Sequence, residues 1–157
     1  MGETGTGQAR IVIIGGGVIG TALAWHLARA GEPDVLLLEK SQFTQGCTWH
    51  PAGLVGQLRT NRNLTRMMQN SVASFETLEA TGRATGWRQV GSLRLASSAD
   101  RWAEIRRSMT FARSFGLECH ALDVAEVVAR FPHVNPAGIV GGAYIASDGY
   151  IDPNSLT

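Results

Sequence analysis

Three glycines and one glutamate stand at a spacing that can hold the phosphates and ribose of a dinucleotide. Gly15, Gly17 and Gly20 form the pattern G-x-G-x-x-G, and Glu39 follows 19 residues after Gly20. The first glycine permits a tight turn, the second lets the backbone approach a pyrophosphate, and the third allows a helix to pack closely on a strand. A carboxylate at this distance can bind ribose hydroxyls, and its charge disfavours a 2′-phosphate. The pattern predicts a dinucleotide site but does not by itself choose between NAD and FAD.

A histidine beside a tryptophan follows this acid among small residues. The segment 46–54 reads GCTWHPAGL and contains Trp49 and His50. The residues alone leave two interpretations of His50 open, a packing residue in a turn or a chemically active group. Cys47 is interpreted as a small packing residue, since no second cysteine is near it in sequence. No spacing of Cys, His or carboxylate residues is typical of a metal site, so none is predicted.

The glycine pattern lies between elements that can position it. The apolar run 11–14 and the apolar run 35–38 are each typical of a strand buried on both faces. Between them, apolar residues recur at helical spacing until Gly31, which can end the helix. The order strand, glycine loop, helix, strand and acid strengthens the dinucleotide prediction, because each part agrees with the others.

The rest of the chain alternates helices and strands without a second phosphate loop. Ser98 can cap a helix that Gly116 ends, and Asp123 with Glu126 form a capping-box pattern. A helical stripe that includes Met67 and Met68 predicts a long helix with both methionines in the core. The expected elements are a helix over about 64–82, a strand at 90–95, a helix over about 99–116, a short helix from 123 and a strand at 139–145.

Several segments together resemble the sarcosine and dimethylglycine dehydrogenase family. That family belongs to the FAD-dependent amine oxidoreductases typified by D-amino-acid oxidase. The resemblance extends over nearly all of the chain from about residue 10. It is carried by GCTWHPAGLVGQLR at 46–59, TGW at 85–87, GSLRLA at 91–96, DGYIDP at 148–153 and SLT at 155–157.

The resemblance implies roles in FAD binding for the residues that follow Glu39. His50 would be bonded covalently to the 8α-methyl carbon of the flavin, and a neutral imidazole is a suitable nucleophile for that bond. Thr48 would donate a hydrogen bond to a phosphate, and Gly53 would let the backbone lie against the isoalloxazine. Lys40 and Leu54 complete the expected cofactor-binding set. Non-covalent FAD remains the alternative.

The resemblance also implies oxidation of an N-methyl amine such as sarcosine or dimethylglycine. Hydride would pass to the flavin, and the iminium product would give formaldehyde or a one-carbon unit bound to tetrahydrofolate. Arg59 would bind the substrate carboxylate or would be an ordinary surface arginine. Three alternatives stay open: a methylaminobutyrate-type oxidase, a non-catalytic relative of the pyruvate dehydrogenase phosphatase regulatory subunit, and a plain NAD-binding module.

The expected fold is α/β, a Rossmann-type FAD-binding domain followed by the first part of an α+β substrate domain. Asp152 and Pro153 are typical of a helix start, yet only four residues follow Pro153. We therefore expect a truncated chain, with the catalytic residues and any folate-binding region beyond Thr157. The expected domains are residues 1–86 for FAD binding, 87–147 for part of the substrate domain and 148–157 for the return to the FAD domain.

Charge and hydropathy give no reason to expect a partner other than the small amine that the resemblance implies. The net charge is +1, which gives no reason to expect nucleic acid as a partner. No apolar run approaches the about 20 residues that a membrane helix needs. The first residues read as a disordered leader without a signal or transit peptide, and the myristoylation pattern at Gly2 and Thr6 is a chance match. Two distant cysteines suit a reducing cytoplasm, and one disulfide between them is the alternative.

Overall fold

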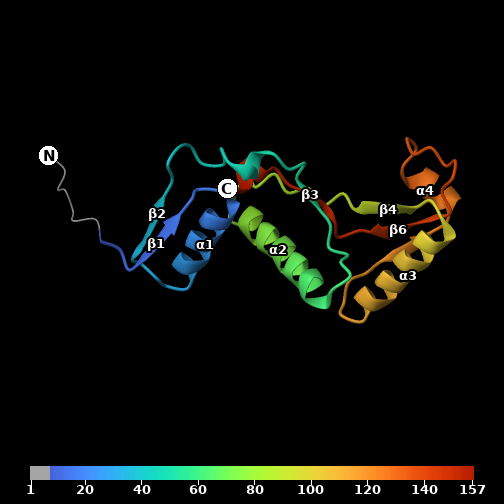
Figure 1. Cartoon of the computed structure of the whole chain (residues 1–157), viewed down its shortest axis with the longest axis horizontal. Helices are drawn as coiled ribbons and strands as arrows, with labels where there is room; N and C mark the ends of the chain where they lie inside the picture. The colour runs from blue at the N-terminus through green and yellow to red at the C-terminus, as the bar shows by residue number, and fades with distance from the viewer. Residues whose placement is uncertain (1–7) are drawn as a thin grey trace. The chain divides into compact units, whose positions relative to one another are not determined.

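The computed structural model describes residues 8–157, which divide into two compact units (Figure 1). The first unit contains residues 8–53, 84–86 and 152–157, and the second contains 54–83 and 87–151. The expected leader and the pattern at Gly2 and Thr6 lie outside the described residues. The expected domain ranges 1–86, 87–147 and 148–157 do not coincide with these two units and remain a prediction.

The first unit is built around two parallel strands joined by a helix (Figure 1). Strand β1 (Ile11–Ile14) pairs with β2 (Val35–Leu38), and helix α1 (Val18–Arg29) connects them. The helix ends before Gly31, whose φ of +81° lies in the left-handed region that glycine tolerates. The expected strand, helix and strand are therefore present.

The β1–β2 sheet is covered on one face only. The side chain of Ile13 is 6% exposed, whereas Ile14 on the opposite face is 86% exposed. Val12, Leu36 and Leu38 are also exposed, and α1 has no buried residue. The prediction that both strands are buried on both faces is wrong for this structure, because one helix shields one face of a two-stranded sheet.

Two short elements complete the first unit. The 3-10 helix η1 (Cys47–Trp49) contacts helix α5 (Pro153–Leu156). Asp152 caps α5 by accepting a hydrogen bond from the Asn154 N–H at 3.0 Å, so the predicted helix start is confirmed. Cys47 is exposed, which makes its expected packing role wrong.

The second unit contains a three-stranded antiparallel sheet in the order β4-β6-β5. These strands are β4 (Ser92–Ala96), β6 (Gly141–Ile145) and β5 (His120–Leu122). Helix α3 (Ala99–Arg113) packs on β4 and β6, and α4 (Val124–Arg130) packs on β5 and β6 (Figure 1). The predicted caps are confirmed: Ser98 accepts from the Arg101 N–H, and Asp123 with Glu126 forms a capping box.

The core of this sheet lies under α3. Ile105, Met109 and Ala112 from the helix join Ala143 and Ile145 from β6 in one buried cluster. Trp102 and Phe115 pack against its edge. The apolar face of α3 therefore faces the sheet.

Helix α2 (Arg62–Ala80) buries only part of its apolar stripe. Val72 is 6% exposed, but Met67 is 62% exposed, so the predicted core position of Met67 is wrong. The same unit contains a short antiparallel pair, β3 (Leu54–Val55) with β7 (Gly149–Tyr150).

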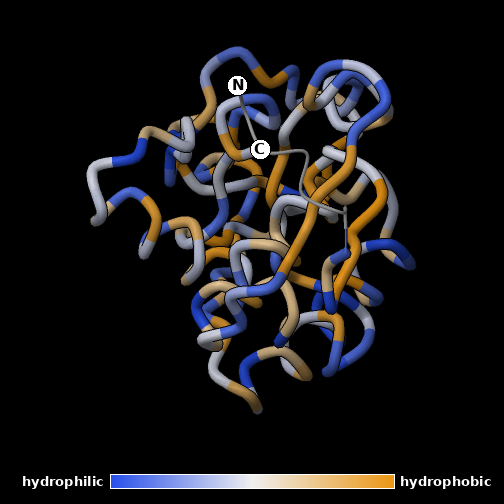
Figure 2. The backbone as a smooth tube through the Cα atoms, turned by 90° about the vertical axis from the view of Figure 1, so that its left-hand side faces the viewer, coloured by the Kyte–Doolittle hydropathy of each residue, from blue (hydrophilic) through white to orange (hydrophobic). Residues whose placement is uncertain are grey.

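No helix within residues 8–157 is long and apolar enough to cross a bilayer. Figure 2 shows that hydrophobic stretches of the chain are short and broken by hydrophilic residues.

Candidate functional site

A tight turn carries the chain from β1 into α1 and depends on glycine. Gly15 has a φ of +110°, and its N–H donates to the Leu38 carbonyl at 2.8 Å. A Cβ on Gly20 would overlap the carbonyl oxygen of Gly15. The turn thus needs a left-handed residue at Gly15 and no side chain at Gly20.

Thr48 reaches the start of α1 from 30 residues away. Its side chain is buried, and its Oγ1 accepts a hydrogen bond from the Val18 N–H at 3.1 Å. A Cβ on Gly17 would lie 2.9 Å from this oxygen, so glycine leaves room for it. Because Oγ1 accepts here, the hydroxyl proton remains able to donate to another group. The free N–H groups and positive end of a helix favour an anion at this point.

Glu39 binds the glycine turn directly. Its carboxylate accepts hydrogen bonds from the Gly16 N–H at 2.7 Å and from the Ser41 N–H at 2.9 Å. These backbone donors, the Gly16 N–H foremost, hold the pKa of Glu39 below its ordinary value. A carboxylate can accept about four hydrogen bonds, so two lone pairs stay available for hydroxyl groups.

Glu39→Gln is expected to remove a pH-dependent contribution to the stability of the turn. Because the folded pKa is lowered, the contribution is complete above the ordinary value of 4.5 and is lost as pH falls through the folded pKa. The thermal midpoint of the variant should lie below the wild-type midpoint at pH 7, and the gap should close towards pH 3. Glu76→Gln, on an exposed part of α2, is the control. A gap that persists below the folded pKa would contradict the carboxylate's role.

His50 follows η1 with an ordered ring. Its Nδ1 lies 3.0 Å from the Gly46 carbonyl oxygen, and its ring centroid lies 4.7 Å from that of Trp49. A carbonyl oxygen can only accept, so this hydrogen bond places the proton on Nδ1 and the lone pair on Nε2. His50 is exposed and Trp49 is 59% exposed. The imidazole is thus held by one nitrogen and accessible at the other.

The remaining expected site residues are divided between the units. Gly53, with a φ of +70°, and the exposed Lys40 belong to the first unit together with Gly15, Gly17, Gly20, Glu39, Thr48 and His50. Leu54 is 81% exposed and pairs with Tyr150 in the second unit. Arg59 is half-buried in the second unit, where its backbone N–H donates to Thr65. The structure therefore brings Glu39 and Thr48 to the glycine turn.

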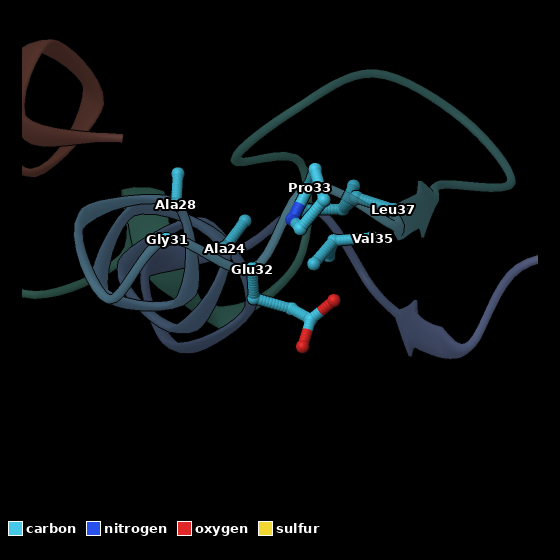
Figure 3. Close-up of a pocket in the computed structure, with 7 residues that line it drawn as sticks. All are labelled: Ala24, Ala28, Gly31, Glu32, Pro33, Val35 and Leu37. Atoms are coloured by element: carbon cyan, nitrogen blue, oxygen red, sulfur yellow. The ribbon is translucent and has the colours of Figure 1, made fainter.

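A separate hollow of about 420 Å³ lies at the other end of α1 (Figure 3). Its wall is mostly small and apolar, and its one carboxylate, that of Glu32, forms an ion pair with Arg10 at 2.7 Å. None of the side chains in this wall can donate a hydrogen bond to phosphate. The residues that form its wall are Ala24, Ala28, Gly31, Glu32, Pro33, Val35 and Leu37.

Sequence reasoning missed a buried polar cluster in the second unit. Asp148 is 1% exposed and accepts from the Gln57 N–H at 2.9 Å and from the Ser92 hydroxyl at 2.5 Å. Arg94 donates to the Leu58 carbonyl at 3.1 Å. The one available signal was an arginine between two leucines of β4, since the partners are 36 to 91 residues apart in sequence.

Comparison with known proteins identifies the family. The profile described as "FAD dependent oxidoreductase" matches residues 10–157, which is most of the chain. The chain belongs to the FAD-dependent oxidoreductase family. Membership of this family makes FAD the expected cofactor, and the resemblance read from the sequence is confirmed.

Two relatives in this family act on N-methylated amino acids according to their names. The chain is 42% identical over 151 residues to mitochondrial dimethylglycine dehydrogenase of Rattus norvegicus, covering 96% of the chain and 18% of that protein. It is 39% identical over 147 residues to human mitochondrial sarcosine dehydrogenase, covering 92% and 16%. The chain thus spans less than a fifth of the length of these relatives.

A solved structure shares the fold. Glycine oxidase from Bacillus cereus superposes with a TM-score of 0.81 at 28% identity, over 95% of this chain and 41% of that chain. The expected α/β class is confirmed at this level. The predicted cytoplasmic location remains a prediction.

Proposed function

We propose that this chain forms the FAD-binding part of an enzyme that oxidises an N-methyl amine of the sarcosine or dimethylglycine type. The observation that carries the proposal is the convergence of Glu39 and Thr48 on the turn between β1 and α1. Family membership and the names of the two relatives support it. In this proposal β1, α1 and β2 belong to a Rossmann-type domain.

The turn would bind the diphosphate and ribose of FAD. The pyrophosphate would lie at Gly17 and the N-terminus of α1, where the Thr48 hydroxyl would donate a hydrogen bond to a phosphate oxygen. Glu39 would accept hydrogen bonds from the ribose hydroxyls with its remaining lone pairs. We assign Gly53 and Leu54 to the isoalloxazine and Lys40 to the edge of the ribose site.

His50 would anchor the flavin covalently. The Gly46 carbonyl fixes the proton on Nδ1 and orients the ring, so Nε2 would be free to bond the 8α carbon of the flavin in place of one C–H hydrogen, which would leave as a proton while two electrons pass to the flavin ring. Exposure of His50 leaves room for the flavin at this nitrogen. An alkylated imidazole withdraws electrons from the flavin, which should favour reduction.

FAD, when bound, supplies the hydride acceptor for the carbon next to the amine nitrogen. The resulting iminium of the substrate would be hydrolysed to formaldehyde or transferred to tetrahydrofolate by a further region of the protein. Residues of this chain would bind and orient the cofactor, and Arg59 would bind a substrate carboxylate.

The proposal is tested by measuring substrate turnover with the protein encoded by the complete open reading frame that contains this chain. The flavin spectrum should bleach anaerobically with sarcosine or dimethylglycine. 4-Methylaminobutanoate is the competing substrate, and faster bleaching with it would move the enzyme to the methylaminobutyrate type. A flavin-free protein that oxidises none of the three would contradict the proposal and favour the regulatory alternative.

A further inference from the structure

The loop after β2 turns back onto the glycine turn of the first unit. Its residues 41–45, which we call the clasp, are closed by a hydrogen bond from the Ser41 hydroxyl to the side-chain oxygen of Gln45. The Thr44 N–H donates to the Gly16 carbonyl at 3.2 Å. The clasp therefore joins the segment after the second strand to the turn between β1 and α1.

Gly16 is held at three of its groups. Its N–H donates to the Glu39 carboxylate at 2.7 Å, and its carbonyl accepts from the Thr44 N–H. A Cβ on Gly16 would lie 2.7 Å from Cδ1 of Phe43 and 3.1 Å from Cβ of Glu39, so the phenyl ring lies against its Cα. A side chain here would displace the ring, which explains a glycine at a position that the G-x-G-x-x-G pattern leaves open.

Thr44 has a backbone conformation that few residues of its type adopt. Its φ is +69°, and it is the only residue other than glycine with a positive φ within residues 8–157. A β-branched side chain makes the left-handed region costly. Such conformations persist where surrounding contacts hold them, and they concentrate at binding sites. The hydrogen bond to Gly16 is one such contact, which indicates that closure of this loop has a function.

Phe43 contributes little to the core of the unit. Its side chain is 57% exposed, and hydrophobic stabilisation scales with the apolar area removed from water. The ring nevertheless lies against Gly16, the residue whose N–H binds the carboxylate of Glu39. Its contact with Gly16 therefore matters more for the geometry of the turn than for burial.

We propose that Phe43 and Thr44 are positioning residues that hold Gly16 and Glu39 in the arrangement that binds the ADP half of FAD. A site that is ordered before its ligand arrives loses less conformational entropy on binding. The inference rests on the proposed function and adds to it two residues outside the expected cofactor-binding set. They act on cofactor affinity through the turn and leave hydride transfer at the flavin unaffected.

The test measures binding of FAD and of ADP, which is the half of FAD that the turn would bind. The complete protein carries His50→Ala in every sample, so that flavin is removable and binding is reversible. In calorimetric titrations, Phe43→Ala should raise Kd for both ligands by the same factor of about 3- to 10-fold, the expected cost of ordering a loop on binding. Phe43→Tyr keeps the ring and should bind both ligands as the reference protein does.

Two substitutions of Thr44 separate its N–H from its side chain. Thr44→Gly keeps the N–H and tolerates the positive φ, so Kd for ADP should change less than about twofold. Thr44→Pro lacks the N–H and is restricted to a negative φ, so Kd should rise at least about tenfold. Equal affinities in these two variants would contradict the role of the hydrogen bond to Gly16. The Phe43 variants decide the inference if Thr44→Pro fails to fold.

A double-mutant cycle tests the contact between Phe43 and Gly16. Gly16→Ala alone should raise Kd for ADP about tenfold, because its methyl group displaces the ring. In the Phe43→Ala background the same substitution should raise Kd about threefold or less, since only the 3.1 Å approach to Cβ of Glu39 remains. Independent effects of the two substitutions would show that the ring does not act through Gly16 and would overturn the inference.

Phe111→Ala is the matched control, because Phe111 is 45% exposed and its ring centroid lies 5.0 Å from that of Phe115. It should leave both Kd values unchanged. A Phe43→Ala protein with a lower thermal midpoint and an unchanged Kd for ADP would overturn the inference, since Phe43 would then be merely structural. So would a higher Kd for FAD with an unchanged Kd for ADP, which would place the effect at the flavin half.

The ADP titrations separate this inference from the proposed function, because they need no amine and no flavin. A wild-type protein that oxidises no N-methyl amine would contradict the proposed function, while weaker ADP binding by Phe43→Ala would still support the clasp. ADP binding that Phe43→Ala does not weaken would contradict the clasp, whether or not the wild-type protein oxidises an amine.

Discussion

Gly20→Val is expected to reduce the FAD content of the complete protein at least about tenfold. A Cβ at this position would overlap the Gly15 carbonyl oxygen and would also lie 3.4 Å from the Ile13 side chain. Replacing a helical glycine normally gains up to about 1 kcal/mol of helix propensity. Here the overlap is with backbone, which cannot rotate away, so α1 must move from β1 and the turn between these two elements must open.

The measurement is the ratio of flavin to protein absorbance after purification. Gly20→Ala should give a smaller loss than Gly20→Val, because its single methyl group requires a smaller displacement. Ala22→Ser, on an exposed position of the same helix, should leave the ratio unchanged. Full flavin content in Gly20→Val would show that close packing of this turn is not required for FAD binding.

Asp148→Ala is expected to destabilise the second unit by about 2–4 kcal/mol. The carboxylate is 1% exposed, and its loss leaves the Gln57 N–H and the Ser92 hydroxyl without their partner. Each buried donor left unsatisfied costs about 1–3 kcal/mol. Asp148→Asn, which keeps an acceptor of the same shape, should cost less than half as much.

Hydrogen exchange of the peptide that covers residues 54–60 checks this expectation. Asp148→Ala should lose protection there and should lower the thermal midpoint of the protein. Asp152→Ala is the control, because Asp152 also accepts from two donors, Asn154 N–H and Ser155 hydroxyl, but is solvent-exposed. Similar effects of the two alanine variants would show that burial of Asp148 does not determine how much this residue stabilises the protein.

The elements of the fold with strong local signals were predictable from the sequence. The caps at Ser98, Asp123 and Asp152 depend on residues within three positions, so the short-range pattern specifies them. Strands β1 and β2 carry continuous β-branched or leucine runs beside a glycine loop. Burial was less predictable, because it depends on which surfaces other elements cover.

Some contacts of the candidate site were likewise predictable from the sequence, and others were not. The glycine turn and Glu39 follow from spacing, and the structure joins them by the Gly16–Glu39 hydrogen bond. The Arg94 and Asp148 contacts join residues 36 and 91 positions away in sequence, which no local pattern encodes. The two-residue strands β3 and β7 escaped prediction because they are too short to show a period.

The most direct test of the central claim is whether flavin stays attached to the denatured protein through His50. The complete wild-type protein is precipitated in acid, washed and digested, and the flavin-bearing peptide is identified by mass. We predict yellow precipitate and an FAD adduct on the peptide that contains His50, and none of either in His50→Ala. Release of all flavin by the wild-type protein, or an adduct that persists in His50→Ala, would contradict the account.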